Sequence, residues 1–305
     1  MKNTLNLFKV NKEKIGQRLD NYIIREFKKI PKSFIYRIIR IGKIRLNGNI
    51  AKAKTRLQNG DQIKTPKFLI TMVKKVYISD KLKKFLLESV IAESNDWLVI
   101  NKPCGISVHG GSKIKIGLIE AIKQARKDID FIELVHRLDK DTSGCLLLAK
   151  SRTALLLFNK AFKNRKIEKC YIALVYGHWP ISINYVTASI KRFNTLNGEY
   201  KMQINQYGKY SFTLFKICKF FYKSTLIKAL PITGRTHQIR VHAAHVGNPI
   251  LGDKKYYNNN SKIISYKLNI NRLFLHAGSI KFPDPTTGKI IHVKAKIDPV
   301  LKEFF

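Results

Sequence analysis

The sequence predicts an α+β fold, in which a small helical and β module precedes a domain built on a large, mainly antiparallel sheet. Apolar residues recur at helical spacing early in the chain, between residues 18 and 40. From residue 91 onward, short apolar runs of strand length alternate with glycine and proline turns. A chain of 305 residues, 45% of them hydrophobic, is long enough to bury the cores of two domains.

The first predicted domain is a small basic module over residues 16–75. Its first helix is expected over residues 18–28, where four apolar side chains fall on one face. A second helix is expected after Pro31, with Ser33 as its N-cap, and Gly42 ends it. The module is therefore expected to contain two amphipathic helices.

Basic side chains gather on this module. After the helices, a strand over residues 43–46 runs into Asn47-Gly48, a pair typical of a tight hairpin turn, and a further strand follows over 62–65. Cations on the outer faces of the helices would offer a surface for phosphates. This predicted RNA-binding surface consists of Arg18, Lys32, Arg37, Arg40 and Lys43. An ordinary solvated basic face remains the alternative.

The second predicted domain covers residues 91–305, after a linker over residues 76–90. Its expected helices are residues 154–162, with Ser151 as the N-cap, and residues 235–246. Its expected strands cover residues 97–101, 145–149, 171–176, 224–230, 273–282 and 290–297. Residues 256–261 are expected to form a polar surface loop without a further role.

The charge of the chain predicts a polyanionic partner. Lysine and arginine total 58 against 20 acidic residues, which gives a net charge of +38. Nucleic acid is the first candidate for such a partner and an anionic membrane the second. Lysine outnumbers arginine 44 to 14, as an AT-rich genome would also produce, so the sign of the charge is more informative than its size.

Cysteine spacing and hydropathy narrow the class of protein. The four cysteines are widely separated and form no Cys-x-x-Cys pair, which argues against a zinc site or a disulfide framework and favours a reducing cytosol. Apolar runs stay below the ~18 residues of a membrane span, and the N-terminus has no apolar signal region. A cytoplasmic protein without a membrane or metal partner is therefore expected.

Residues 134–150, LVHRLDKDTSGCLLLAK, are the most informative stretch. They set one carboxylate, Asp139, beside His136, Arg137 and Lys140, just before a predicted buried strand. Nearby cations favour the charged form of a carboxylate, and such a carboxylate can act as a nucleophile or a base. A salt-bridged turn is the alternative interpretation.

Two further segments contain reactive side chains. Lys169-Cys170-Tyr171 opens a predicted strand with a tyrosine that could stack on a flat ligand. The segment TGRTHQIR, residues 233–240, places two arginines and a glutamine at a predicted helix start, where backbone N–H groups also point outward. An arginine of this segment could pair with Asp139 and hold its carboxylate in place.

These segments together resemble the motif set of the RluA-type pseudouridine synthases. The matching strings are HRLDKDTSG, NKPCGISVHGGS, KCYIALVYG and TGRTHQIRVH, while GQRLDNYI and PKSFIYRIIRIGKIRLN resemble the RNA-binding module of small-subunit ribosomal protein four. With NRLFLHA near Asn271, the arrangement is most similar to the RluC branch, which modifies large-subunit ribosomal RNA. The RluD branch has the same domain order and different target uridines, so it remains an alternative.

The resemblance implies a fold, a reaction and roles for particular residues. It implies a pseudouridine synthase fold and isomerisation of flipped-out uridines, without a cofactor and by a monomer. Asp139 matches the essential aspartate, Tyr171 the tyrosine that packs on the target uracil, and Arg240 the arginine paired with the aspartate. Arg137 matches the residue that enters the RNA stack. The other expected RNA contacts of this domain are His136, Lys102, Arg235, His237 and Gln238.

A rival function from another class remains open at this point. A ribosome-assembly factor that binds ribosomal RNA without catalysis would have the same basic character. Such a scaffold need not keep Asp139, Tyr171 and Arg240 together, so their presence favours an enzyme.

Overall fold

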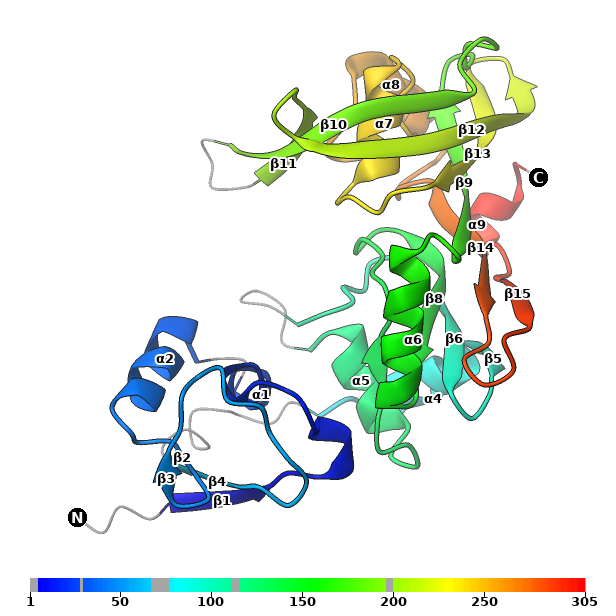
Figure 1. Cartoon of the computed structure of the whole chain (residues 1–305). Helices are drawn as coiled ribbons and strands as arrows, with labels where there is room; N and C mark the ends of the chain where they lie inside the picture. Colours follow the sequence, from blue (N-terminus) through cyan, green and yellow to red (C-terminus); the bar gives the residue numbers. More distant parts are fainter. Residues whose placement is uncertain (1–4, 28–29, 67–76, 111–115, 196–199, 305) are drawn as a thin grey trace. The chain divides into compact units, whose positions relative to one another are not determined.

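The structure, a computed structural model, divides the chain into two compact units, Met1–Tyr77 and Ile78–Phe305 (Figure 1). It describes residues 5–27, 30–66, 77–110, 116–195 and 200–304. The predicted domain boundary at residue 75 lies outside these residues. Within the segment predicted as a linker, helix α4 (Asp80–Glu88) packs against α5 (Leu118–Ala125) of the second unit. Most of that segment is therefore folded, because α4 buries Leu86 in the core of the second unit.

The N-terminal unit combines two helices with a small sheet. The helices are α1 (Leu19–Glu26) and α2 (Lys32–Arg40), preceded by the short 3-10 helix η1 (Lys12–Lys14). The sheet has the order β1-β4-β2-β3, with β1 (Leu5–Lys9), β4 (Gln62–Pro66), β2 (Arg45–Leu46) and β3 (Asn49–Ile50). The predicted hairpin turn is confirmed, since Asn47 and Gly48 both adopt positive φ, 51° and 83°.

The predicted cap of the second helix is wrong. Helix α2 begins at Lys32, so Ser33 lies inside its first turn and Pro31 occupies the cap position. Three isoleucines of α2, Ile35, Ile38 and Ile39, face a core that includes residues of α1. The basic residues of α2 are consequently left on the outer face of the helix.

The second unit is built on one eleven-stranded sheet. Its main path runs β11-β10-β12-β13-β9-β14-β8-β6-β5, with β15 beside β14 and β7 beside β8, and nearly all neighbours are antiparallel. The first strands along the chain are β5 (Val90–Glu93), β6 (Trp97–Lys102), β7 (Glu133–Leu134), β8 (Ser143–Ala149) and β9 (Glu168–Tyr176). The remaining strands are β10 (Tyr185–Asn194), β11 (Tyr200–Ile204), β12 (Lys209–Phe221), β13 (Ser224–Pro231), β14 (Leu275–Pro283) and β15 (Ile290–Lys294). The predicted α+β class with a large, mainly antiparallel sheet is confirmed.

Strand β8 lies inside this sheet, between β14 and β6, and is buried on both faces. Leu146 and Leu148 pack into the core that contains α5, whereas Cys145 and Leu147 pack on the opposite face with α6 (Arg152–Lys163). A strand covered on both sides needs a continuous apolar run, which is the pattern that predicted it. Ser151 caps α6 as expected, because its hydroxyl accepts a hydrogen bond from the Ala154 amide at 3.0 Å.

Three more helices complete the second unit. Helix α7 (Gln238–His245) packs against β10, β11, β12 and β13 (Figure 1), and α8 (Asn259–Lys267) and α9 (Pro299–Lys302) follow. Helix α7 begins three residues later than predicted, because His237 adopts a left-handed conformation with φ 55° that lies outside a helix. Among the described residues, every helix is too short or too polar to span a membrane.

Candidate active site

Asp139 faces a small cavity of about 90 Å³ in the second unit. The walls come from the loop before β8, from β9, and from the turn that leads into α7, and they include Asp139, Tyr171, His237 and Arg240. A wider cavity of about 620 Å³ shares Asp139, His237 and Arg240 with the first. The structure therefore brings together segments that lie up to 101 residues apart along the chain.

The loop that presents Asp139 is held by its neighbour in the sheet, the segment after β6. The ammonium of Lys102 donates to the carbonyl of Lys140 at 3.0 Å, and the Gly105 amide donates to the same carbonyl at 2.9 Å. Gly144 then allows the chain to enter β8, since it has φ 107° and an added Cβ would lie 2.3 Å from a backbone oxygen of β14. Asp139 thus stands on a backbone that is fixed at both ends.

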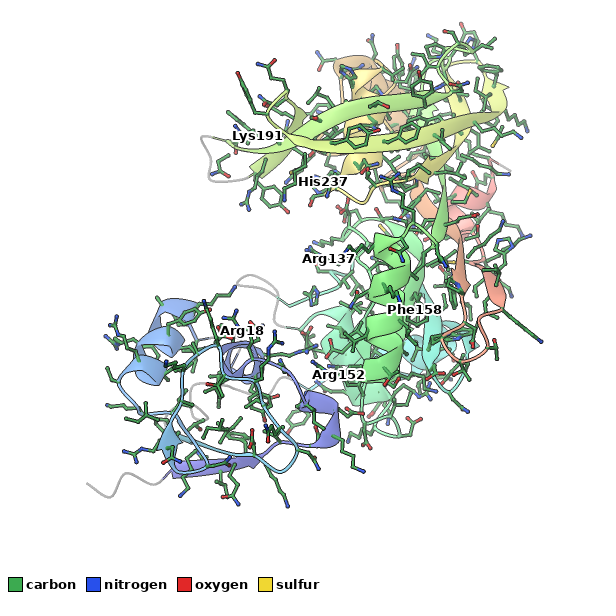
Figure 2. All side chains as sticks on the ribbon, viewed as in Figure 1. Arg18, Arg137, Arg152, Phe158, Lys191 and His237 are labelled. Carbon is green, nitrogen blue, oxygen red and sulfur yellow. The ribbon has the colours of Figure 1, made fainter. Side chains whose placement is uncertain are left out.

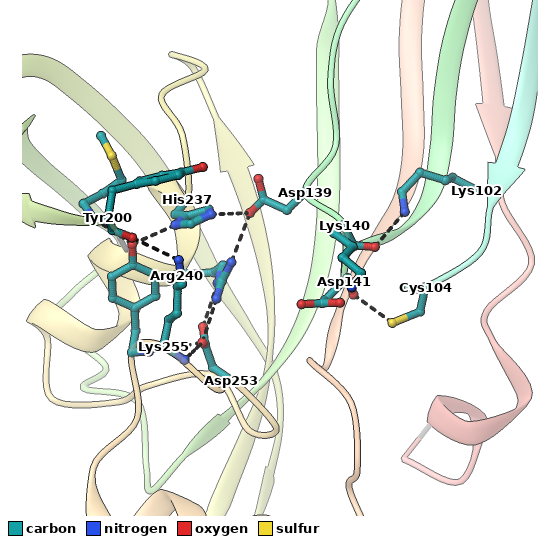
Figure 3. A network of polar contacts seen from close by, with 12 residues as sticks. Lys102, Cys104, Asp139, Lys140, Asp141, Tyr200, His237, Arg240, Asp253 and Lys255 are labelled. Carbon is teal, nitrogen blue, oxygen red and sulfur yellow. Dashed lines mark hydrogen bonds and ion pairs between the residues drawn. The ribbon is translucent and has the colours of Figure 1, made fainter. Parts of the chain in front are cut away.

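Arg240 connects Asp139 to a buried carboxylate that the sequence analysis did not identify. Its guanidinium makes two bonds to Asp253, Nε to Oδ2 at 2.7 Å and Nη2 to Oδ1 at 2.8 Å, and Nη1 lies 3.4 Å from Oδ2 of Asp139 (Figure 3). Burial alone would lower the pKa of Arg240, but the bonds to Asp253 and the attraction of Asp139 raise it above its usual range. The same pairing holds the pKa of Asp253 below its usual value, although burial acts in the opposite direction. Arg240 is therefore a fixed cation beside Asp139.

His237 lies on the same side of Asp139 as Arg240 and belongs to an aromatic cluster. Its Nε2 is 3.8 Å from Oδ2 of Asp139 (Figure 3). Its Nδ1 is 2.7 Å from the hydroxyl of Tyr256. The ring of Tyr200 stacks on His237 with a centroid distance of 6.1 Å and an interplanar angle of 12°. Burial lowers the pKa of His237 more than Asp139 raises it, so the imidazole is neutral at neutral pH.

Tyr171 supplies an aromatic wall of the small cavity. It lies on β9 between β13 and β14, and its side chain is buried. Burial, with a further contribution from the negative charge of Asp139, raises the pKa of Tyr171 above its usual range. Its hydroxyl consequently keeps its proton at neutral pH.

Three residues predicted to contact RNA form hydrogen bonds within the protein. Lys102 is fully buried, and its ammonium donates to three backbone carbonyls. His136 accepts a hydrogen bond from the Leu147 amide at 3.0 Å, and burial lowers its pKa to about 3, so it is uncharged. Gln238 is buried and bonds to β12 and to the turn before α7. Partners within the protein therefore occupy polar atoms of all three side chains.

The other predicted contacts remain at the surface. In the second unit, Arg137 and Arg235 are exposed and line the cavity, with Arg137 on the loop before β8 (Figure 2). In the N-terminal unit, Arg18 is bound to the buried Asp20, so part of its charge is already compensated. The other four cations predicted to bind RNA in that unit are exposed: Lys32, Arg37, Arg40 and Lys43.

Two residues of the site were missed from the sequence, Asp253 and Tyr256. Tyr256 lies in the segment predicted to be a surface loop without a role, yet Arg240 stacks over its ring at 5.0 Å and its hydroxyl accepts a bond from the Met202 amide. Burial raises the pKa of Tyr256 to about 12. A signal was available in the string Leu-Gly-Asp, in which an acid follows an apolar run and a glycine.

The described part of the chain contains no group of three His, Cys, Asp or Glu side chains that could hold a metal ion. The side chains that meet at the site are one partly exposed carboxylate, its arginine, a neutral histidine and two tyrosines. A carboxylate fixed beside a small cavity, with an aromatic wall, can attack or deprotonate a flat ligand with a sugar attached.

Comparisons with known proteins agree with this geometry. Residues 96–245 match the family model for RNA pseudouridylate synthase. A protein of Buchnera aphidicola subsp. Schizaphis graminum, "Ribosomal large subunit pseudouridine synthase C", is 44% identical over 99% of this chain and 96% of its own length. The chain belongs to the RNA pseudouridylate synthase family. The synthase also matches the S4 domain model over residues 17–63.

Further relatives agree on both units of the synthase. The protein of the same name from Escherichia coli is 38% identical over 96% of this chain and 93% of its own length. The solved structure of human RNA Pseudouridylate Synthase Domain Containing 4 has a TM-score of 0.60 at 26% identity, over 73% of this chain and 93% of the human chain. The synthase is thus an isomerase with an S4-type N-terminal unit, and the resemblance predicted from its motifs is confirmed.

Proposed function

We propose that this synthase converts specific uridines of large-subunit ribosomal RNA to pseudouridine, with Asp139 as the nucleophile or base. The similarity to relatives of that name, which extends over nearly the full length of both units, carries the proposal. The site supports it, because Asp139, Tyr171 and Arg240 meet at one cavity.

The reaction breaks the N1–C1′ bond, turns the detached uracil and joins C5 to C1′. In this proposal Asp139 acts at the ribose, and Arg240 keeps the carboxylate oriented from its fixed position on Asp253. Tyr171 packs against the uracil while the ring is detached. Because no atoms are gained or lost, the reaction needs no redox group or group donor.

The uridine must leave its stack to reach Asp139, which costs a few kcal/mol and least in loops and bulges. We assign Arg137 to the space that the uridine vacates, since its side chain is exposed beside the cavity. Arg235 and His237 complete the contacts around the flipped nucleotide. The exposed cations of α2 would bind phosphates of the same RNA away from the reacting base.

We also propose that the synthase acts in the cytoplasm as a monomer. A single chain contains every residue that the proposal uses, and ribosomal RNA is reached there. Sedimentation of the protein with and without RNA would check the oligomeric state.

A comparison of pseudouridine positions tests the proposed function. Large-subunit ribosomal RNA from cells with the gene, without it, and with the Asp139→Asn variant would be mapped for pseudouridine. We expect particular positions to lose the modification both without the gene and with the variant. Identical pseudouridine maps of large-subunit ribosomal RNA in all three strains would contradict the proposal. Positions lost from another RNA would show that this RNA is the substrate.

A further inference from the structure

Lys169 lines the same cavity as Asp139 and Tyr171, yet it takes no part in the network described above. Lys169 and Tyr171 are two residues apart on β9, so their side chains leave the same face of the strand. The ladder between β9 and β13 ends at Tyr171, which leaves Lys169 beside the loop that contains Gly234. A Cβ added to Gly234 would lie 3.8 Å from Nζ of Lys169, so the ammonium is close to this loop.

The ammonium of Lys169 has no hydrogen-bond acceptor or carboxylate among the described residues. Its contact is with the ring of Phe162, whose centroid lies 5.5 Å from Nζ. Burial lowers the pKa of Lys169 to about 8, and no nearby acid offsets this effect. Arg240, in contrast, is more deeply buried and is bound by Asp253. A partly buried cation without a partner is unfavourable unless a ligand supplies one.

The position of Lys169 within the cavity indicates which ligand atoms it meets. Lys169 and Tyr171 line the small cavity but not the wider cavity that Asp139, His237 and Arg240 also line. Lys169 therefore lies on the same side of Asp139 as Tyr171, away from the wider cavity. With Asp139 at the ribose and Tyr171 against the uracil, Lys169 lies at the part of the cavity that the far edge of the base would enter.

We propose that Lys169 is a further catalytic residue, which donates a hydrogen bond to a carbonyl oxygen of the flipped uracil and stabilises the negative charge on the displaced base. The inference rests on the proposed function, because it needs uridine as the substrate. When the N1–C1′ bond breaks, its electron pair stays with the base, and the charge spreads onto the two carbonyl oxygens. A hydrogen-bond donor to these oxygens stabilises the transition state more than it stabilises the bound substrate.

The step balances without a new reactant. Whether Asp139 attacks C1′ or removes a proton from the ribose, the pair from the N1–C1′ bond goes to the base. The C5–C1′ bond then forms with electrons of the base, while the Asp139–C1′ bond breaks or the proton taken from the ribose returns to it. The proton on C5 leaves to a base of the site, and N1 takes up a proton. Lys169 keeps its own proton throughout and acts as a charged donor.

The full-length protein with Lys169→Met tests the proposal, with Lys166→Met as the matched control. Lys166 is an exposed lysine just before β9 and lines none of the cavities described above. The substrate is a large-subunit ribosomal RNA fragment that the wild-type protein modifies. We expect Lys169→Met to lower the single-turnover rate at saturation by about 10²- to 10³-fold, as loss of one charge-stabilising donor does. The RNA dissociation constant of Lys169→Met should stay at the wild-type value. For Lys166→Met, the rate and the dissociation constant should both equal those of the wild type.

Two further variants separate charge from packing. Lys169→Arg keeps the cation and should retain most of the rate, whereas Lys169→Gln keeps the length without the charge and should resemble Lys169→Met. Lys169→Gln also provides the comparison if Lys169→Met destabilises the strand, as thermal unfolding would show. Equal rates for Lys169→Gln and wild type would overturn the proposal.

A fluorinated substrate distinguishes the base from a phosphate as the target of Lys169. Fluorine at C5 withdraws electrons, so 5-fluorouracil carries negative charge more readily and depends less on an external donor. The rate penalty of Lys169→Met should therefore be smaller for loss of 5-fluorouridine than for loss of uridine. If Lys169→Met raises the RNA dissociation constant and its rate penalty is equal for both substrates, Lys169 contacts a phosphate and not the base. A wild-type protein that modifies neither RNA would instead contradict the proposed function.

Discussion

Each unit of the synthase contains a fully buried aspartate that binds an arginine, but the two pairs serve different ends. In the N-terminal unit, Asp20 binds Arg18, two residues earlier, and the side chain of Arg18 stays 33% exposed. In the second unit, Asp253 binds Arg240 from another element, and the side chain of Arg240 is 7% exposed. The first pair joins neighbouring residues at the start of α1, whereas the second pair places a cation beside Asp139.

The difference shows what makes a charge pair structural or functional. If its aspartate were lost, Arg18 could be hydrated, because water already reaches it. Arg240 could not, and its remaining partner would be Asp139 at 3.4 Å. Removing one member of a buried pair leaves an uncompensated charge, which destabilises by about 3–5 kcal/mol. We therefore expect substitutions in the pair of the second unit to slow the reaction much more than substitutions in the pair of the N-terminal unit.

The largest expected effect is that of Asp139→Asn, which removes the charge at nearly constant shape. We expect the rate of pseudouridine formation to fall at least about a thousandfold, as loss of a nucleophile or base does. RNA binding should survive, because the exposed cations of both units are unchanged. Rapid-quench assays and filter binding with one RNA would measure the two quantities. Turnover above a few per cent of wild type would contradict the assignment of Asp139.

Asp253→Asn and Asp20→Asn compare the two buried pairs directly. Asp253→Asn should lower the unfolding free energy by about 3–5 kcal/mol and slow the reaction, because Arg240 would shift toward Asp139. Asp20→Asn should leave the rate at saturating RNA unchanged. Thermal unfolding would measure the stability of each variant, and single-turnover assays would measure its rate. A slowed reaction in Asp20→Asn would show that the N-terminal pair also affects the reaction.

The pair of Arg240 and Asp253 predicts that the stability of the protein depends on pH. The pKa of Asp253 is held below its usual value by Arg240 in the folded protein. Its stabilisation is therefore present above the unfolded value of about 4 and is lost as the pH falls through the lower, folded value. Acid titration monitored by circular dichroism should show the stability gap between wild type and Asp253→Asn narrowing below about pH 4. A gap that stays constant down to pH 2 would argue against this ion pair.

Tyr171→Phe should have an intermediate effect, since it keeps the ring and removes the hydroxyl. The raised pKa of Tyr171 keeps the hydroxyl protonated, so it can donate a hydrogen bond or pass on a proton. If it assists the removal of the C5 proton, the reaction should slow by about a hundredfold and stall after glycosidic cleavage. Release of deuterium from RNA with 5-deuterouridine would follow this step. Wild-type kinetics would confine Tyr171 to packing.

The smallest effect on chemistry is expected from the N-terminal unit. Deletion of residues 1–75 should raise the RNA concentration for half-maximal rate while the rate at saturation stays nearly constant. Replacement of Arg37 or Arg40 by glutamine in the full chain should reduce the salt slope of RNA binding by about one for each lost phosphate contact. Equal binding of the deleted and full-length proteins across a salt series would show that the unit is not an RNA anchor.

Much of this molecule is determined by local sequence. The apolar run of β8 predicts a strand buried on both faces, and Asn47-Gly48 predicts its turn, because backbone geometry sets the period of side chains and the sign of φ. Asp139 stands out by its position between cations and a buried strand. These features depend on residues a few positions apart, so they can be read without the fold.

Tertiary structure decided which charged and polar side chains reach the site. Lys102, His136 and Gln238 have the residue types of RNA contacts, yet the fold pairs each of them with backbone groups. Asp253 has only the short string Leu-Gly-Asp as a local signal, and the fold brings it and Tyr256 beside Arg240. Burial and partners at long separation follow from how elements pack, and no local pattern contains that information.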